Sequence, residues 1–176
     1  MNDEELDNFQ YIFGDAFNDL IEKNNSFQEK INPPPRIDVL YHNPDLIPIN
    51  LSENGDWIDL RAAEEYHIYP NKFYLINLGI SVKLPEGYEA HIVPRSSTFK
   101  TWGLIQTNGI GIIDNSYCGE NDIWMMPVIS TKITTINVND RICQFRIVKK
   151  MPKLKINTVD HLLDESRGGF GSTGEN

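Results

Sequence analysis

The chain has 176 residues, of which 40% are hydrophobic and 23% charged, and this composition suits one globular domain with a short extension. It has no apolar run of 18 residues and starts with an acidic segment, so we expect no membrane span, no secretory signal and a cytoplasmic location. The 16 basic and 25 acidic residues give a net charge of −9, which argues against a nucleic-acid partner. Two cysteines are too few for a disulfide scaffold.

Residues 1–35 are an acidic extension with 8 acidic and 2 basic residues. Apolar residues recur at intervals of three and four over residues 3–30, which predicts an amphipathic helix. The prolines at 33–35 predict an extended linker and a domain boundary. We expect the helix to pack on its own domain or its own oligomer, and a separate protein partner is the alternative.

Residues 36–166 consist of short β-branched and aromatic runs between clusters of Gly, Pro, Asn and Asp. This spacing predicts an all-β sandwich or barrel. The predicted strands are Ile37–Tyr41, Phe73–Val82, Tyr88–Val93, Gly109–Ile113, Ile123–Ile129, Ile133–Val138, Arg141–Val148 and Leu154–Val159. Ser96 and Ser97 are suited to cap a single helical turn over Thr98–Thr101.

The last ten residues, 167–176, form a glycine-rich tail whose composition predicts a mobile segment. Glycines leave backbone N–H groups able to point at one anion. Arg167, Ser172 and Thr173 add donors that suit a phosphate, and Phe170 is able to stack on a flat base. A flexible tail without function is the alternative.

Two internal segments carry residues suited to phosphate chemistry. Arg95 ends a predicted strand and two serines then open a helical turn, which either binds a phosphate or is an ordinary N-cap. Asp114 follows an apolar strand, where it either activates a water molecule as a general base or forms a hairpin turn. Tyr117, three residues later, offers a ring to support a sugar face.

Two further segments contain paired polar and apolar residues. Within Arg141–Phe145, a regular strand puts Ile142 and Gln144 on one face and the three odd-numbered residues on the other. Gln144 then suits a phosphate oxygen and Arg141 a carboxylate, unless this is an ordinary half-buried strand. Asp59 either lies near a metal or ends a turn.

Taken together, in this order and at this spacing, these segments resemble the trimeric dUTPase (dUTP pyrophosphatase) family, especially members from some Gram-positive bacteria and their phages. The corresponding motifs are Asp59, Pro94–Ser97, Gly111–Gly119, Arg141–Gln144 and Arg167–Gly174. The resemblance covers residues 36–174. It implies a distorted jelly-roll or β-barrel with one short helix, here with a helical extension at 1–35, a β-domain at 36–166 and a C-terminal lid at 167–176.

The resemblance also implies an activity, the hydrolysis of dUTP to dUMP and pyrophosphate, which keeps uracil out of DNA and supplies dUMP for thymidylate synthesis. Asp114 would activate the water that attacks the α-phosphorus. Mg²⁺ would be held mainly by the substrate phosphates, with Asp59 reaching it through water. The family further implies a homotrimer with shared active sites. The implied substrate-binding residues are Arg95, Ser96, Ser97, Asn108, Gly111, Ile112, Ile113, Tyr117, Gln144, Arg167, Phe170, Gly171, Ser172 and Thr173.

Two alternatives to this function stay open. A dCTP deaminase on the same fold needs a catalytic glutamate in the region of Ile123–Met126, which contains no carboxylate. A regulatory or structural nucleotide-binding protein would keep the fold and use the N-terminal helix as a docking element.

Overall fold

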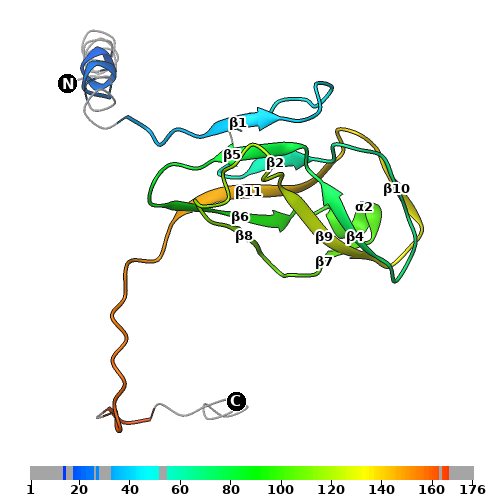
Figure 1. The fold of residues 1–176 in the computed structure, drawn as a ribbon. Helices are drawn as coiled ribbons and strands as arrows, with labels where there is room; N and C mark the ends of the chain where they lie inside the picture. Colours follow the sequence, from blue (N-terminus) through cyan, green and yellow to red (C-terminus); the bar gives the residue numbers. More distant parts are fainter. Residues whose placement is uncertain are drawn as a thin grey trace, which may run out of the picture.

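The body of the molecule is built from short strands and one short helix (Figure 1). The structure, a computed structural model, describes residues 14, 18–25, 27, 33–51, 55–162 and 164–166. The elements are β1 (Asp38–Tyr41), β2 (Ile58–Arg61), β3 (Tyr66–Ile68), β4 (Phe73–Asn77), β5 (Ile80–Lys83), β6 (Tyr88–Pro94), α2 (Thr98–Trp102), β7 (Leu104–Gln106), β8 (Gly111–Ile113), β9 (Met125–Ser130), β10 (Thr134–Ile136) and β11 (Arg141–Lys149). The predicted all-β domain with one short helix is confirmed.

Four small antiparallel sheets share one hydrophobic core. Their strand orders are β1–β5, β10–β3, β2–β11–β6–β8 and β4–β9–β7. Every sheet buries side chains in the same cluster, which contains Val82, Ile136, Phe145 and Met126 among others. The rings of Trp124 and Phe145 meet edge to face inside it, with centroids 5.2 Å apart. Sheets that close around a single core give the barrel-like architecture.

The predicted strand Phe73–Val82 is wrong, because the chain turns within it and forms two strands in different sheets. The Asn77 side chain accepts the Gly79 N–H at 2.7 Å, and Gly79 has a left-handed φ of 65°. A Cβ at Gly79 would lie 2.5 Å from Leu46 Cδ1 and 2.6 Å from Ala63 Cβ. Only glycine therefore fits both the conformation and the space at this turn.

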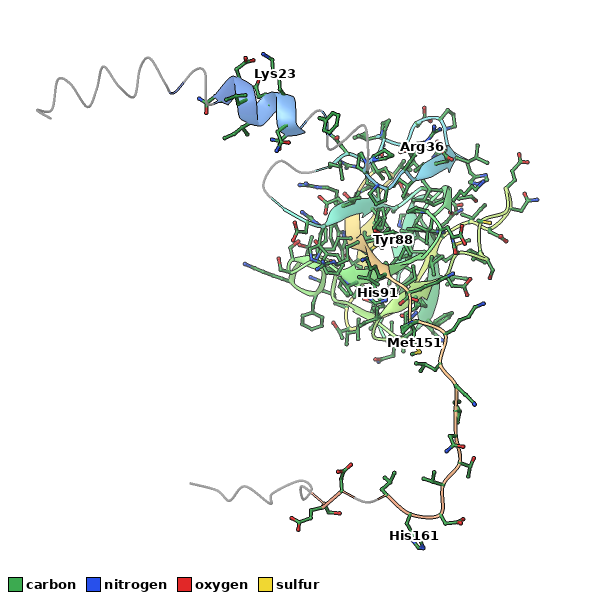
Figure 2. The ribbon with its side chains drawn as sticks, turned by 90° about the vertical axis from the view of Figure 1, so that its left-hand side faces the viewer. Lys23, Arg36, Tyr88, His91, Met151 and His161 are labelled. Atoms are coloured by element: carbon green, nitrogen blue, oxygen red, sulfur yellow. The ribbon has the colours of Figure 1, made fainter. Side chains whose placement is uncertain are left out.

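The predicted strand Leu154–Val159 is also wrong. After β11 the chain runs as an extended arm over residues 151–162, whose side chains are exposed and which contains no strand. Figure 2 labels Met151 where this arm leaves the body and His161 far along it. The alternation of apolar residues there suits a strand, but this chain supplies no partner strand to pair with it.

The N-terminal extension is helical at residues 14, 18–25 and 27, which confirms the predicted helix at those positions. The rest of the 3–30 prediction lies outside the described residues. Leu20, Ile21 and Phe27 are exposed in the single chain, so what covers the apolar face stays a prediction. In the part of the chain that the structure describes, no helix has the length and apolar character needed to cross a membrane.

Candidate active site

The connection from β6 to α2 carries Arg95, Ser96 and Ser97. The buried Thr98 hydroxyl accepts the Arg95 backbone N–H at 2.9 Å and donates to the Ile142 carbonyl at 2.8 Å. Ser97 precedes the helix without making a capping hydrogen bond through its side chain, so the predicted serine cap is wrong. Thr98 therefore closes the turn that presents Arg95 and ties it to β11.

Asp59, in β2, lies between two arginines. Its Oδ1 is 2.6 Å from Arg95 Nε, and its Oδ2 is 3.0 Å from Arg141 Nη1. The Asp59 and Arg95 side chains are only 30% and 25% exposed, so this contact is partly shielded from water. Two cations share one anion, and the cluster keeps a net positive charge that suits a phosphate group.

A β-bulge at the start of β11 brings Arg141 and Gln144 to one face. The register with β2 shifts between Arg141 and Cys143, and Ile142 and Cys143 are both fully buried. The inserted residue reverses the side-chain alternation, so the predicted separation of Arg141 from Gln144 on opposite faces is wrong. Gln144 pairs in register with Asp59, which adds it to the arginine cluster.

A second group of predicted residues lines a pocket of about 420 Å³ beside β8. These residues are Asn108, Gly111, Ile112, Ile113, Asp114 and Tyr117. The Tyr117 hydroxyl donates to the Ile123 carbonyl at 3.3 Å, which steadies its ring at the pocket wall. Sequence reasoning missed the apolar lining formed by Leu75, Ile92, Ile123, Trp124 and Met125, because nothing in the sequence separates these residues from the rest of the core.

Asp114 is exposed at the end of β8. Its Oδ1 accepts the Ser116 hydroxyl at 2.5 Å and the Ser116 N–H at 2.7 Å. These two hydrogen bonds, with a smaller contribution from the positive charge of Lys150, hold the pKa of Asp114 below its usual value. The carboxylate is therefore ionised at neutral pH and able to accept a proton.

The arginine cluster and the Asp114 pocket lie toward opposite ends of β6. Ala90 pairs with Ile113, directly before Asp114, whereas Arg95 follows the other end of the strand. The strand residues between Ala90 and Arg95 span about 15–20 Å. A single chain therefore does not bring the Arg95 group and the Asp114 group together at one phosphate.

The predicted tail residues Arg167, Phe170, Gly171, Ser172 and Thr173 lie outside the described residues. A larger apolar groove of about 890 Å³ runs beside β1 and β11, and no predicted site residue lines it.

The two cysteines are both free thiols in very different surroundings. Cys143 is fully buried under the arginine cluster, and burial, with a smaller effect of the Asp59 charge, raises the pKa of its thiol far above the ordinary value. Cys118 is exposed and directly follows Tyr117. Cys143 is therefore chemically inert at neutral pH, whereas Cys118 is accessible.

Comparison with known proteins identifies the family. The dUTPase family profile matches residues 49–174. The chain is 53% identical to the SPbeta prophage-derived deoxyuridine 5′-triphosphate nucleotidohydrolase of Bacillus subtilis, over 79% of this chain and 98% of that protein.

Solved structures agree with this fold. The dUTPase of Staphylococcus bacteriophage 80alpha with dUpNHpp has a TM-score of 0.65 at 19% identity, covering 79% of this chain and 98% of that one. The dUTPase of Staphylococcus aureus phage phi11, which coordinates a structural Mg(II) ion, has a TM-score of 0.63 at 17% identity, covering 73% of this chain and 99% of that one. The match over most of the chain and the order of the motifs together establish that the protein belongs to the dUTPase family.

Proposed function

We propose that this enzyme hydrolyses dUTP to dUMP and pyrophosphate, with Asp114 as the general base for water attack on the α-phosphorus. The observation that carries the proposal is the ionised Asp114 carboxylate beside a pocket of the size that holds small molecules. Its reaction would keep uracil out of DNA and supply dUMP for thymidylate synthesis.

The pocket supports recognition of a deoxyuridine. The backbone of Gly111, Ile112 and Ile113 would hydrogen-bond the uracil, and the Tyr117 ring would pack under the deoxyribose, leaving no room for a 2′-hydroxyl. Asn108 is already fixed, because its Oδ1 accepts the Gln106 amide at 2.9 Å.

The arginine cluster supports binding of the phosphates. Arg95, Ser96, Ser97 and Gln144 would hold phosphate oxygens through hydrogen bonds, of which the arginine's are charge-assisted. Donors fixed before the reaction stabilise the charge that grows on the phosphate oxygens in the transition state.

The residues present fit a Mg²⁺ ion that arrives with the substrate. Among the residues that the structure describes, no three His, Cys, Asp or Glu side chains gather into a metal site, and both Asp59 oxygens already contact arginines. Mg²⁺ is commonly bound by one or two carboxylates, water and substrate phosphates. Asp59 would hold the ion through water, and the bound ion would neutralise part of the triphosphate charge.

A homotrimer with shared active sites is supported by the separation of Asp114 from Arg95 along β6. A neighbouring subunit would supply the group that one chain leaves out of reach. The exposed arm at residues 151–162 is also suited to carry its tail to a neighbour. There Phe170 would cover the base, with Arg167, Gly171, Ser172 and Thr173 on the phosphates, as a lid that excludes bulk water.

Deamination of dCTP is disfavoured by the residues at the end of β8 and the start of β9. Trp124 and Met126, in the region where a deaminase needs its glutamate, are fully buried apolar side chains. A purely regulatory role is disfavoured by the ionised Asp114, although a docking role for the N-terminal helix is compatible with catalysis.

The test is pyrophosphate release from dUTP, dTTP, dCTP and UTP with Mg²⁺, together with ammonia release from dCTP. We expect turnover of dUTP alone, and Asp114→Asn should lower kcat by about 100-fold or more. Asp45→Asn, which removes the same charge at an exposed position away from the pocket, is the matched control. A folded wild-type trimer that hydrolyses none of the four nucleotides would refute the proposal.

A further inference from the structure

We infer that Ser116 is a positioning residue that fixes the Asp114 carboxylate for proton transfer, an inference that rests on the proposed role of Asp114. The two residues lie in one turn, in which the Tyr117 N–H donates to the Asp114 carbonyl at 3.2 Å. Both donors of Ser116, the N–H and the hydroxyl, reach the same oxygen, Oδ1. No described residue donates a hydrogen bond to Oδ2.

The hydroxyl is the part of this contact that depends on serine. Any residue other than proline at position 116 supplies the N–H, but only a hydroxyl side chain adds the second donor. Two donors on Oδ1 fix the rotation of the carboxylate and leave Oδ2 to face the pocket. A general base must be held within hydrogen-bond reach of the proton that it accepts, so this restraint acts on catalysis directly.

Asn115 complements Ser116 by anchoring the backbone of the same turn. Its amide group donates to the carbonyls of Leu84 and Pro85, each at 3.2 Å, in the connection between β5 and β6. Asn115 thus fixes where the turn lies, whereas Ser116 fixes how the carboxylate is rotated. The two residues should give different kinetic signatures when each is truncated.

The charges around Asp114 determine the sign of the pH effect. Besides the Ser116 donors, the Tyr117 N–H faces Asp114 from its own turn, and Lys150 faces it from the end of β11, where its N–H donates to the Gly87 carbonyl. All three favour the carboxylate anion. Removal of the Ser116 hydroxyl should therefore raise the pKa of Asp114 and protonate the base at a higher pH.

The experiment measures kcat and KM for dUTP from acidic to neutral pH in three variants. Ser116→Ala should lower the plateau kcat about fivefold, with KM changed less than about twofold, and should move the acid limb of kcat/KM to higher pH. Ser116→Thr keeps the hydroxyl and should restore both. Asn115→Ala should lower kcat without moving the acid limb.

A second measurement is independent of turnover. A ¹³C NMR titration of the aspartate carboxyl groups, with Asp114 assigned by its loss in Asp114→Asn, should show a higher pKa for Asp114 in Ser116→Ala than in the wild type. An unchanged pKa or an unmoved acid limb in an active enzyme would overturn the role of Ser116. Absence of dUTP hydrolysis by the wild type would instead overturn the proposed function.

Discussion

Arg95 is held at two points that leave part of its guanidinium group directed away from the protein. Nε contacts Asp59 at 2.6 Å, and Nη1 donates to the Arg141 carbonyl at 3.5 Å. Within the described part of the chain, Nη2 has no hydrogen-bond partner. The side chain is therefore oriented before a phosphate arrives, and less conformational entropy is lost on binding.

Truncation of this side chain tests its role at the phosphate. Arg95→Ala should lower kcat/KM for dUTP about 10- to 100-fold, because it removes a charge-assisted hydrogen bond. Arg95→Lys should recover only part of this loss, since one ammonium group does not reproduce the planar fork. Arg146→Ala, which removes a guanidinium stacked over Trp57 at 5.5 Å, is the control. Equal losses in both alanine variants would show a general charge effect and contradict the assignment.

Several site residues were identifiable from the sequence, but their contacts were not. Arg95, Asp114 and Gln144 stand in recognisable motifs, whereas the pairing of Asp59 with Arg95 depends on β11 lying between β2 and β6. That strand order brings together residues far apart in the chain, and local patterns do not encode it. Ser116 gave no signal, because serine is ordinary in a turn.

The helix α2 has five residues, too few to be stable without tertiary contacts. The Thr98 hydroxyl joins its start to β11, and Gly103 ends it with a left-handed φ of 70° and an N–H that donates to the Phe99 carbonyl. This element therefore acts as a clamp that keeps Arg95 beside Asp59.

Loss of the Thr98 hydroxyl should loosen this clamp. Thr98→Val leaves the Arg95 N–H and the Ile142 carbonyl without their partner at a fully buried position, which should cost about 1–3 kcal/mol of unfolding free energy. Urea denaturation measures this change, and kcat/KM for dUTP should fall with it. Thr101→Val, an exposed position in the same helix, should change stability by less than about 0.5 kcal/mol. Similar values for the two variants would contradict the role of Thr98.

The longer elements were predictable and the shorter ones were not. The long strands β6 and β11 carry enough β-branched residues to show their type. The strands β2, β3 and β7 have three or four residues, too few to display a period of two, and were not predicted. The bulge at Ile142 was also unpredicted, because it is specified by pairing with β2 rather than by its own sequence.

At the scale of the whole molecule, the length of β6 decides how many chains an active site needs. The strand separates the Asp114 pocket from the arginine cluster by about 15–20 Å, farther than one side chain reaches. Two inactive variants, each lacking one of these groups, should therefore be able to complete each other in a mixed oligomer.

Subunit mixing tests this expectation. Asp114→Asn and Arg95→Ala chains, mixed in equal amounts and refolded together, should recover up to about a quarter of the wild-type activity when each site combines one group from each of two chains. Each variant refolded alone is the control. A mixture no more active than its components would place both groups of a site in one chain.

The contrast between the two cysteines has a practical consequence. Because Cys143 is fully buried and Cys118 is exposed, a maleimide dye should attach to the natural sequence at one position only. That position adjoins Tyr117, the ring proposed to support the sugar. The enzyme thus already carries an attachment point for a fluorescent reporter, from which nucleotide occupancy and the arrival of a neighbouring subunit can be followed in real time.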